Sequence, residues 1–231
     1  MITKRDRNGR QMTCYFQGCE EKGTTKEHIP PRSFFPEGEK HQLVTVKSCP
    51  AHNNAKSKDD LYVLAQICMH ASPANRAREV WLTKVAPQLE FNGGKLRDML
   101  AEGAVQVEGG VAYPVRIERL DEFFTALSCG LIAASQRRSL PANYSINHIY
   151  PSLATGSDSV SEALKQGIEE FYSGKPLAVM EFGKPGLHNE RIYTAEVFGL
   201  PDFKGSITIV HLFFGKFKVI SMLSKYFEMP D

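Results

Sequence analysis

The chain has 231 residues, of which 42% are hydrophobic and 23% charged, and its formal net charge is +2 at pH 7. These values describe a soluble protein that is long enough to bury a sizeable core in one or two domains. No run of about 18 apolar residues is present, which excludes a membrane-spanning helix, and the opening residues MITKRDRNGRQMT lack the apolar segment of a secretory signal. We therefore expect a cytoplasmic protein with no membrane partner.

The positive charge is concentrated near the N-terminus. Residues 1–58 contain 11 Lys and Arg against 6 Asp and Glu, which leaves 17 against 20 in residues 59–231. The first segment therefore has a net charge of +5 and the second a net charge of −3. Such an asymmetry indicates an acidic partner for the N-terminal part, and nucleic acid is the usual one. A solvated charged face is the alternative.

In chain order, the first predicted elements are a turn, a strand and a helix. The stretch CYFQGCEEKGTT, residues 14–25, predicts a knuckle turn, and the β-branched run Gln42–Val46 predicts a strand. A helix is expected to begin near Asn53 or to restart at Ser57, because apolar residues then recur at helical spacing as far as Cys68.

The rest of the chain mixes helical and strand patterns. We predict a helix over residues 74–89, a hairpin around the Glu-Gly-Gly turn at 108–110, a long helix from Leu120 to Ala134, a loop over residues 151–160, a helix over Glu162–Tyr172, and strands over residues 191–198, 205–214 and 216–223. This combination predicts an α+β fold.

Five cysteines in a chain without a secretory signal are more often metal ligands or buried small side chains than a disulfide framework. Cys14 and Cys19 form one close pair, and Cys49 with His52 forms a second. Two turns that each present two N or S ligands are typical of a closed tetrahedral zinc site, so we predict structural zinc at these four residues. Buried thiols beside a chance histidine are the alternative.

Glu27 and His28 lie between the two ligand pairs, and Asn53 directly follows the second pair. If zinc joins the two turns, the segment that carries His28 lies against the start of the following helix. A neutral imidazole can take a proton from water, while carboxylate and amide oxygens can hold a magnesium ion that keeps several waters. Without the flanking ligands, Glu27-His28 would be interpreted as a solvated dipeptide before a turn.

Residues 14–60, CYFQGCEEKGTTKEHIPPRSFFPEGEKHQLVTVKSCPAHNNAKSKDD, resemble the HNH endonucleases that contain a structural zinc. In that family, Cys pairs surround an Asp-His or Glu-His-Ile-x-Pro core, and the motif closes in Cys-x2-Cys-Asn or Cys-x2-His-Asn. EHIPP at residues 27–31 and HNNAKS at residues 52–57 match this order. The two ligand pairs match the family's structural zinc ligands, and the middle Asn of the family falls near Gln42.

The resemblance implies a ββα-metal fold and a role for each matching residue. His28 corresponds to the general base that activates water. Glu27 and Asn53 correspond to the ligands of a catalytic Mg²⁺ or Mn²⁺. Lys56 corresponds to the basic residue that faces the phosphate, and Arg32 is expected as a second nucleic-acid contact.

The remaining histidines lie in no recognisable motif. They are expected to be surface residues or hydrogen-bonded core residues: His41, His70, His148, His188 and His211. Trp81 and the pair Phe123 and Phe124 are expected to lie in the core.

Taken with the resemblance, the sequence predicts an HNH nuclease domain over residues 8–72 and a mixed α+β domain over residues 73–231, whose role in substrate or partner recognition is open. The expected function is a metal-dependent endonuclease that hydrolyses phosphodiester bonds in DNA, in a bacterial or phage restriction or defence setting. Two alternatives remain, a catalytically silent zinc-containing module that binds nucleic acid and a nuclease subunit activated by a partner protein. Self-association is also open.

Overall fold

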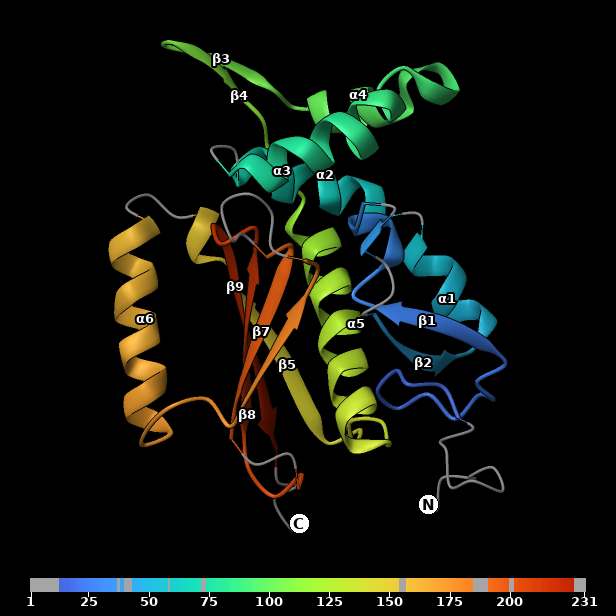
Figure 1. Cartoon of the computed structure of the whole chain (residues 1–231), viewed down its shortest axis with the longest axis vertical. Helices are drawn as coiled ribbons and strands as arrows, with labels where there is room; N and C mark the ends of the chain where they lie inside the picture. The colour runs from blue at the N-terminus through green and yellow to red at the C-terminus, as the bar shows by residue number, and fades with distance from the viewer. Residues whose placement is uncertain are drawn as a thin grey trace.

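The computed structural model describes residues 13–36, 38–39, 43–57, 59–71, 74–153, 157–184, 191–199 and 202–226, with the backbone alone at 54–57 and 157–158. Helices and strands both contribute, so the fold is α+β, as predicted. Figure 1 shows a sheet with helix α5 along one side and helix α6 along the other, and a small hairpin unit beyond α5. No helix in this described part has both the length and the apolar character needed to cross a bilayer.

The N-terminal unit consists of two antiparallel strands followed by a helix. Its elements are β1 (Thr25–Ile29), the 3-10 turn η1 (Arg32–Phe34), β2 (Val44–Ser48) and α1 (Pro50–Ser57). Strand β2 ends two residues beyond the predicted Gln42–Val46, and Gln42 lies outside the described residues. Helix α1 begins three residues before Asn53, because Pro50 suits the first turn of a helix, where its missing N–H is not needed. The Asn53 N–H then donates to the Cys49 carbonyl (3.0 Å).

A helical segment and an exposed hairpin follow α1. Its elements are α2 (Asp60–His70), α3 (Asn75–Val80), the π-helical turn η3 (Trp81–Val85), the 3-10 turns η4 (Ala86–Gln88) and η5 (Phe91–Gly94), α4 (Lys95–Ala101), β3 (Val105–Val107) and β4 (Gly110–Ala112). The helix predicted over residues 74–89 is confirmed as a run of α, π and 3-10 turns. The predicted hairpin is also confirmed, because β3 and β4 pair around a turn that ends in Gly109, whose φ of 82° favours glycine.

The C-terminal part is an antiparallel sheet between two helices. Its elements are α5 (Ile117–Gln136), β5 (Tyr144–Ile149), the 3-10 turn η6 (Pro151–Leu153), α6 (Ser157–Phe171), β6 (Ala178–Phe182), β7 (Tyr193–Phe198), β8 (Ile207–Phe213) and β9 (Phe217–Lys225), with strand order β5-β9-β8-β7-β6. The long helix and the last three strands are confirmed. The predicted loop over residues 151–160 is wrong in its second half, because α6 begins at Ser157 and not near Glu162. Ser and Asp favour the first turn of a helix as well as loops.

The N-terminal unit and the sheet share one core. Ile29 of β1 packs against α5 at Gly130, where a Cβ atom would lie 2.4 Å from the Ile29 Cδ1. Phe34 of η1 stacks on Phe123 of α5 with ring centroids 5.2 Å apart, and its ring centroid lies 5.8 Å from that of Phe213 in β8. The hairpin is therefore held against α5. Buried residues on both sides of the predicted domain boundary form a single cluster, and the boundary itself stays a prediction.

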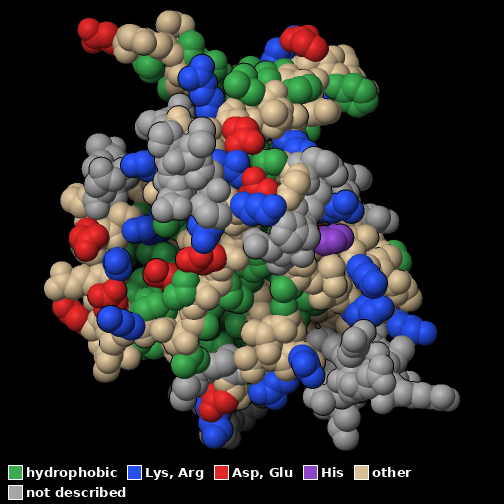
Figure 2. All heavy atoms as spheres, in the orientation of Figure 1, with side chains coloured by type: hydrophobic (Ala, Val, Ile, Leu, Met, Phe, Trp, Pro, Cys, Tyr) green, Lys and Arg blue, Asp and Glu red, His purple; other side chains and the backbone are tan. Residues whose placement is uncertain are grey.

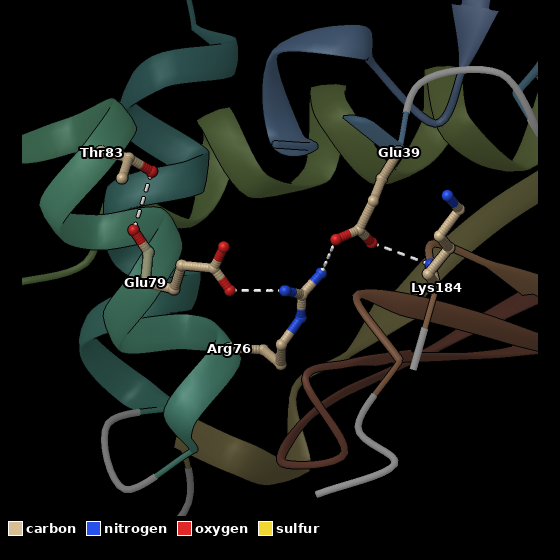
Figure 3. A network of polar contacts seen from close by, with 5 residues as sticks. All are labelled: Glu39, Arg76, Glu79, Thr83 and Lys184. Carbon is tan, nitrogen blue, oxygen red and sulfur yellow. Dashed lines mark hydrogen bonds and ion pairs between the residues drawn. The ribbon is translucent and has the colours of Figure 1, made fainter. Parts of the chain in front are cut away.

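A buried ion cluster holds the loop between β1 and β2. Glu39 in this loop accepts hydrogen bonds from the Arg76 guanidinium of α3 and from the Lys184 backbone N–H (2.8 Å), which follows β6 (Figure 3). Arg76 also pairs with Glu79, one turn further along α3. The side chains of Glu39 and Arg76 are only 12% and 10% exposed. The C-terminal part thus contributes directly to the conformation of a loop inside the N-terminal unit.

A chain of hydrogen bonds between α5 and the sheet encloses two histidines. His148 of β5 contacts the hydroxyls of Thr125 (2.9 Å) and Ser221 (2.8 Å), and His211 of β8 contacts those of Ser221 (2.9 Å) and Tyr193 (2.7 Å). Burial lowers the pKa of His148 to about 4 and lowers the pKa of His211 well below its usual value. His211 is fully buried and His148 is half-buried, and both are hydrogen-bonded, which agrees with the prediction of surface or hydrogen-bonded core residues. The other three histidines without a motif are exposed (His70) or lie outside the described residues (His41 and His188).

Candidate functional site

The two predicted ligand pairs come together in one cluster. Cys14 and Cys19 lie on the knuckle before β1, Cys49 lies between β2 and α1, and His52 lies in the first turn of α1. Their four ligand atoms all lie within 4.8 Å of one another. Among the residues that the structure describes, this is the only group of three or more His, Cys, Asp or Glu side chains placed to hold a metal ion. The predicted juxtaposition is therefore confirmed as a possible metal-binding site.

The separations of the ligand atoms fit a tetrahedral zinc ion. Bonds of about 2.3 Å to sulfur and about 2.0 Å to nitrogen place the donor atoms of such a site roughly 3.5 to 3.8 Å apart. The Sγ atoms of Cys19 and Cys49 are 4.0 Å apart, and His52 Nδ1 lies 3.5 Å from the Sγ of Cys14 and 3.1 Å from the Sγ of Cys49. The donor set is thus compatible with structural zinc bound through Nδ1 of His52.

The surroundings of the cluster favour the metal-binding protonation state at two of the four residues. Burial lowers the pKa of His52, so its imidazole is neutral at pH 7. Burial acts to raise the pKa of Cys49, but hydrogen bonds, first that from the His52 backbone N–H, outweigh it and hold this pKa below its usual value. Burial raises the pKa of Cys19 to about 11. Metal binding must therefore displace the proton of Cys19, which couples binding to pH.

Two neighbouring side chains support the cluster. The Phe16 ring stacks on the His52 imidazole, with ring centroids 4.3 Å apart and 12° between the planes. The Gln17 side-chain amide donates to the carbonyls of Pro141 (2.8 Å) and Tyr144 (2.7 Å), between α5 and the start of β5. Sequence reasoning singled out neither residue. An aromatic ring inside the knuckle is a signal for Phe16, whereas the partners of Gln17 are more than 120 residues away and leave no local signal.

Glu27 and His28 lie on opposite faces of the hairpin. Alternation along β1 buries Glu27 and leaves Lys26 and His28 on the other, more open face. In the antiparallel register, Glu27 is opposite the buried Val46, and His28 is opposite the exposed Thr45. The face with Glu27 is the one that packs against α5, while His28 is half-exposed.

The sequence predicts that Glu27 and Asn53 hold a catalytic Mg²⁺ or Mn²⁺. Glu27 is only 9% exposed, and Asn53 is half-buried in α1, which packs against β1. The buried Tyr15 hydroxyl, whose pKa is raised by burial and by the negative charge of Glu27, has no hydrogen-bond partner among the described residues. Carboxylate and amide oxygens are ligands that suit a hydrated cation. Within the described part of the chain, Glu27 belongs to no group of three His, Cys, Asp or Glu side chains that could hold a metal ion.

The two basic residues expected to contact nucleic acid lie in different elements of the N-terminal unit. Arg32 is exposed in η1. Lys56 lies in the last turn of α1, where only the backbone is described. Their role in nucleic-acid binding stays a prediction.

The chain matches no family model, no curated protein and no solved structure. The motifs of residues 14–60 and the geometry that brings them together are therefore the basis for a functional proposal.

Proposed function

We propose that the chain is a metal-dependent endonuclease of the HNH type that hydrolyses phosphodiester bonds in DNA. The observation that carries the proposal is the consecutive unit of β1, β2 and α1, in which the pair Cys14 and Cys19 meets the pair Cys49 and His52. This unit has a histidine on its open face, and a carboxylate and an amide in the strand and helix that pack together. Those are the groups that hydrolysis assisted by one metal ion requires.

His28 is the proposed general base. Its imidazole is half-exposed on the open face, so it can accept a proton from a water molecule as the water attacks phosphorus. Glu27 and Asn53 are the proposed oxygen ligands of Mg²⁺ or Mn²⁺. Such an ion, when bound, stabilises the negative charge that develops on the phosphate and on the leaving 3′ oxygen.

The opposite orientations of Glu27 and His28 restrict the position of the scissile phosphate. Side chains on two faces of a strand approach a common point only around the edge of that strand, and β1 has no second partner strand among the described residues. We therefore infer that the phosphate binds along the free edge of β1. A phosphate over the middle of either face would be reached by only one of the two side chains.

A catalytically silent zinc-containing module that binds nucleic acid is a second candidate, which one observation favours. Glu27 is 9% exposed, and a buried carboxylate can serve a structural role when its hydrogen bonds are satisfied. The two candidate functions differ in whether His28 is needed for activity.

Cleavage of supercoiled plasmid DNA distinguishes the two functions. Zinc-loaded protein is incubated with plasmid, with and without added Mg²⁺ or Mn²⁺. We expect metal-dependent cleavage that His28→Ala slows by about 10² to 10⁴-fold, with zinc content and thermal stability unchanged. The exposed His70 is the matched control, and His70→Ala is expected to cut as fast as the wild type. DNA binding without cleavage under all conditions would support the silent module.

A further inference from the structure

We propose that Lys26 and Lys47 form a clamp for the backbone of DNA on the open face of the hairpin. The inference rests on the proposed function and identifies the surface that receives its substrate. In the register of the two strands, Lys26 of β1 lies directly opposite Lys47 of β2. Residues paired in this way have Cβ atoms about 4.5 to 5.5 Å apart on the same face. His28 lies two residues after Lys26 and therefore shares that face.

The lysine clamp is electrostatically unfavourable when nothing is bound to it. Like charges directly opposite each other destabilise a pair of strands. Neither ammonium group forms an ion pair with another residue in the described ranges. Glu20 and Glu21, on the loop before β1, are exposed, and neither forms an ion pair with Lys26 or Lys47 in the described part of the chain. An anion bound between the two ammonium groups removes this repulsion.

Gly23 restricts the base of the Lys47 side chain. The chain before β1 passes so close to Lys47 that a Cβ atom at Gly23 would lie 2.6 Å from the Lys47 Cβ. Lys47 is accordingly half-buried, whereas Lys26 is exposed. A lysine whose aliphatic stem is packed while its ammonium group reaches solvent acts as a positioned point charge.

A nucleic-acid backbone fits this face better than a single small anion. Figure 2 shows Lys and Arg side chains gathered over the part of the surface that β1 and β2 form, next to a histidine. Residues two apart along a strand are about 6.6 Å apart, so Lys26 and His28 are spaced like successive phosphates of an extended nucleic-acid strand. A backbone that crosses the open face toward the free edge of β1 would thus place one phosphate at the lysine clamp and the next, the scissile phosphate, beside His28 at that edge.

Salt dependence of DNA binding tests the lysine clamp. Binding of a short fluorescent duplex is measured by anisotropy over a series of salt concentrations in the His28→Ala background, with Lys26→Gln, Lys47→Gln and the double variant. Each phosphate contact contributes about 0.9 to the slope of log affinity against log salt. The double variant is therefore expected to reduce the magnitude of the slope by about 1.8. In the active protein, it should raise KM for cleavage and leave kcat nearly unchanged.

A matched pair of exposed lysines controls for net charge. Lys165 on α6 and Lys216 before β9 are exposed, and their double Gln variant is expected to leave the slope unchanged. Because Gln removes a repulsion at the clamp, Lys26→Gln and Lys47→Gln should keep or raise Tm, which a structural role would not do. The proposal is overturned if the double variant at the clamp has the same slope as the control pair. It is also overturned if the double variant reduces the slope for an RNA probe but not for the DNA duplex. The anisotropy measurement of DNA binding does not depend on cleavage. If the wild type shows the expected slopes but does not cleave DNA, the proposed nuclease activity is refuted and the lysine clamp is not.

Discussion

The Phe16 ring lies parallel to the His52 imidazole, with ring centroids 4.3 Å apart and 12° between the planes. Because this stacking orients Nδ1 toward the cysteines, we expect Phe16→Ala to weaken zinc binding by about tenfold, as loss of a group that orients a metal ligand typically does. Competition with a coloured chelator measures the affinity. Phe91 in η5 is 68% exposed, so Phe91→Ala is the control. Equal zinc affinity in both variants would show that the ring has no orienting role.

Removal of zinc is expected to unfold the N-terminal unit, because the binding energy of a structural zinc site is part of the folding energy. Treatment of the wild type with a strong chelator should lower Tm, and added Zn²⁺ should restore it while Mg²⁺ should not. Cys49→Ser should show the lowered Tm without any chelator. Protein that metal analysis proves to be free of zinc, yet melts at the original temperature, would refute a structural site.

Gly130→Ala is expected to destabilise the protein, because the added Cβ would lie 2.4 Å from the Cδ1 of Ile29 in a packed core. Overpacking of this kind typically costs about 1 to 3 kcal/mol. Gly167 in α6 is the matched control, because a Cβ there meets nothing within 4 Å and should stabilise the helix by about 1 kcal/mol. Urea unfolding measures both. Shortening Ile29 to Val in the Gly130→Ala protein should recover part of the loss.

Glu39→Gln is expected to cost about 1.5 to 3 kcal/mol of stability, because it removes a charge that accepts hydrogen bonds in a largely buried cluster. Glu90, whose pair with Arg97 is exposed, is the control, and Glu90→Gln should change stability by less than about 1 kcal/mol. Thermal and urea unfolding test both variants. An equally small effect at the two positions would mean that the loop between β1 and β2 does not depend on the ion cluster.

Stability is expected to fall with acid because of His148. Burial lowers its pKa to about 4 in the folded protein, against about 6.5 in the unfolded chain, although the nearby Asp121 acts in the opposite direction. The unfolded chain therefore takes up the proton first, so stability that is present above about pH 6.5 is lost as the pH falls toward 4. The expected loss from this residue is roughly 2 to 4 kcal/mol.

Comparison of the wild type with His148→Gln isolates this contribution from those of His211 and the zinc ligands. Urea unfolding at pH 7 and pH 5 should show a smaller difference for the variant than for the wild type. The same pH dependence in both proteins would contradict the assignment of this effect to His148.

The metal cluster could be predicted from the sequence because it depends on local spacing. Two short pairs on two turns have few ways to meet, and the structure brings Cys14 and Cys19 to Cys49 and His52. The strands β7, β8 and β9 could also be predicted from the sequence, because they are rich in β-branched and aromatic residues.

Other features depend on distant partners and leave no local pattern. Strand β6 is short and mostly exposed, so its side chains do not follow a clear alternation. Glu39 and Arg76 are 37 residues apart, and nothing near either residue indicates that they pair. Glu27 and His28 point to opposite faces because side chains alternate along a strand. The family resemblance assigns a role to each residue but does not say on which face of the hairpin it lies.

The close approach of Ile29 to Gly130 bears on whether the hairpin is a transferable module. A protein engineer who grafted residues 13–57 onto another scaffold would carry the zinc ligands but leave behind the helix surface against which β1 rests. The recipient would need a residue without a side chain opposite Ile29 and an aromatic ring for Phe34. Inheritance of this hairpin by recombination would face the same requirement, so the segment and α5 are expected to evolve together.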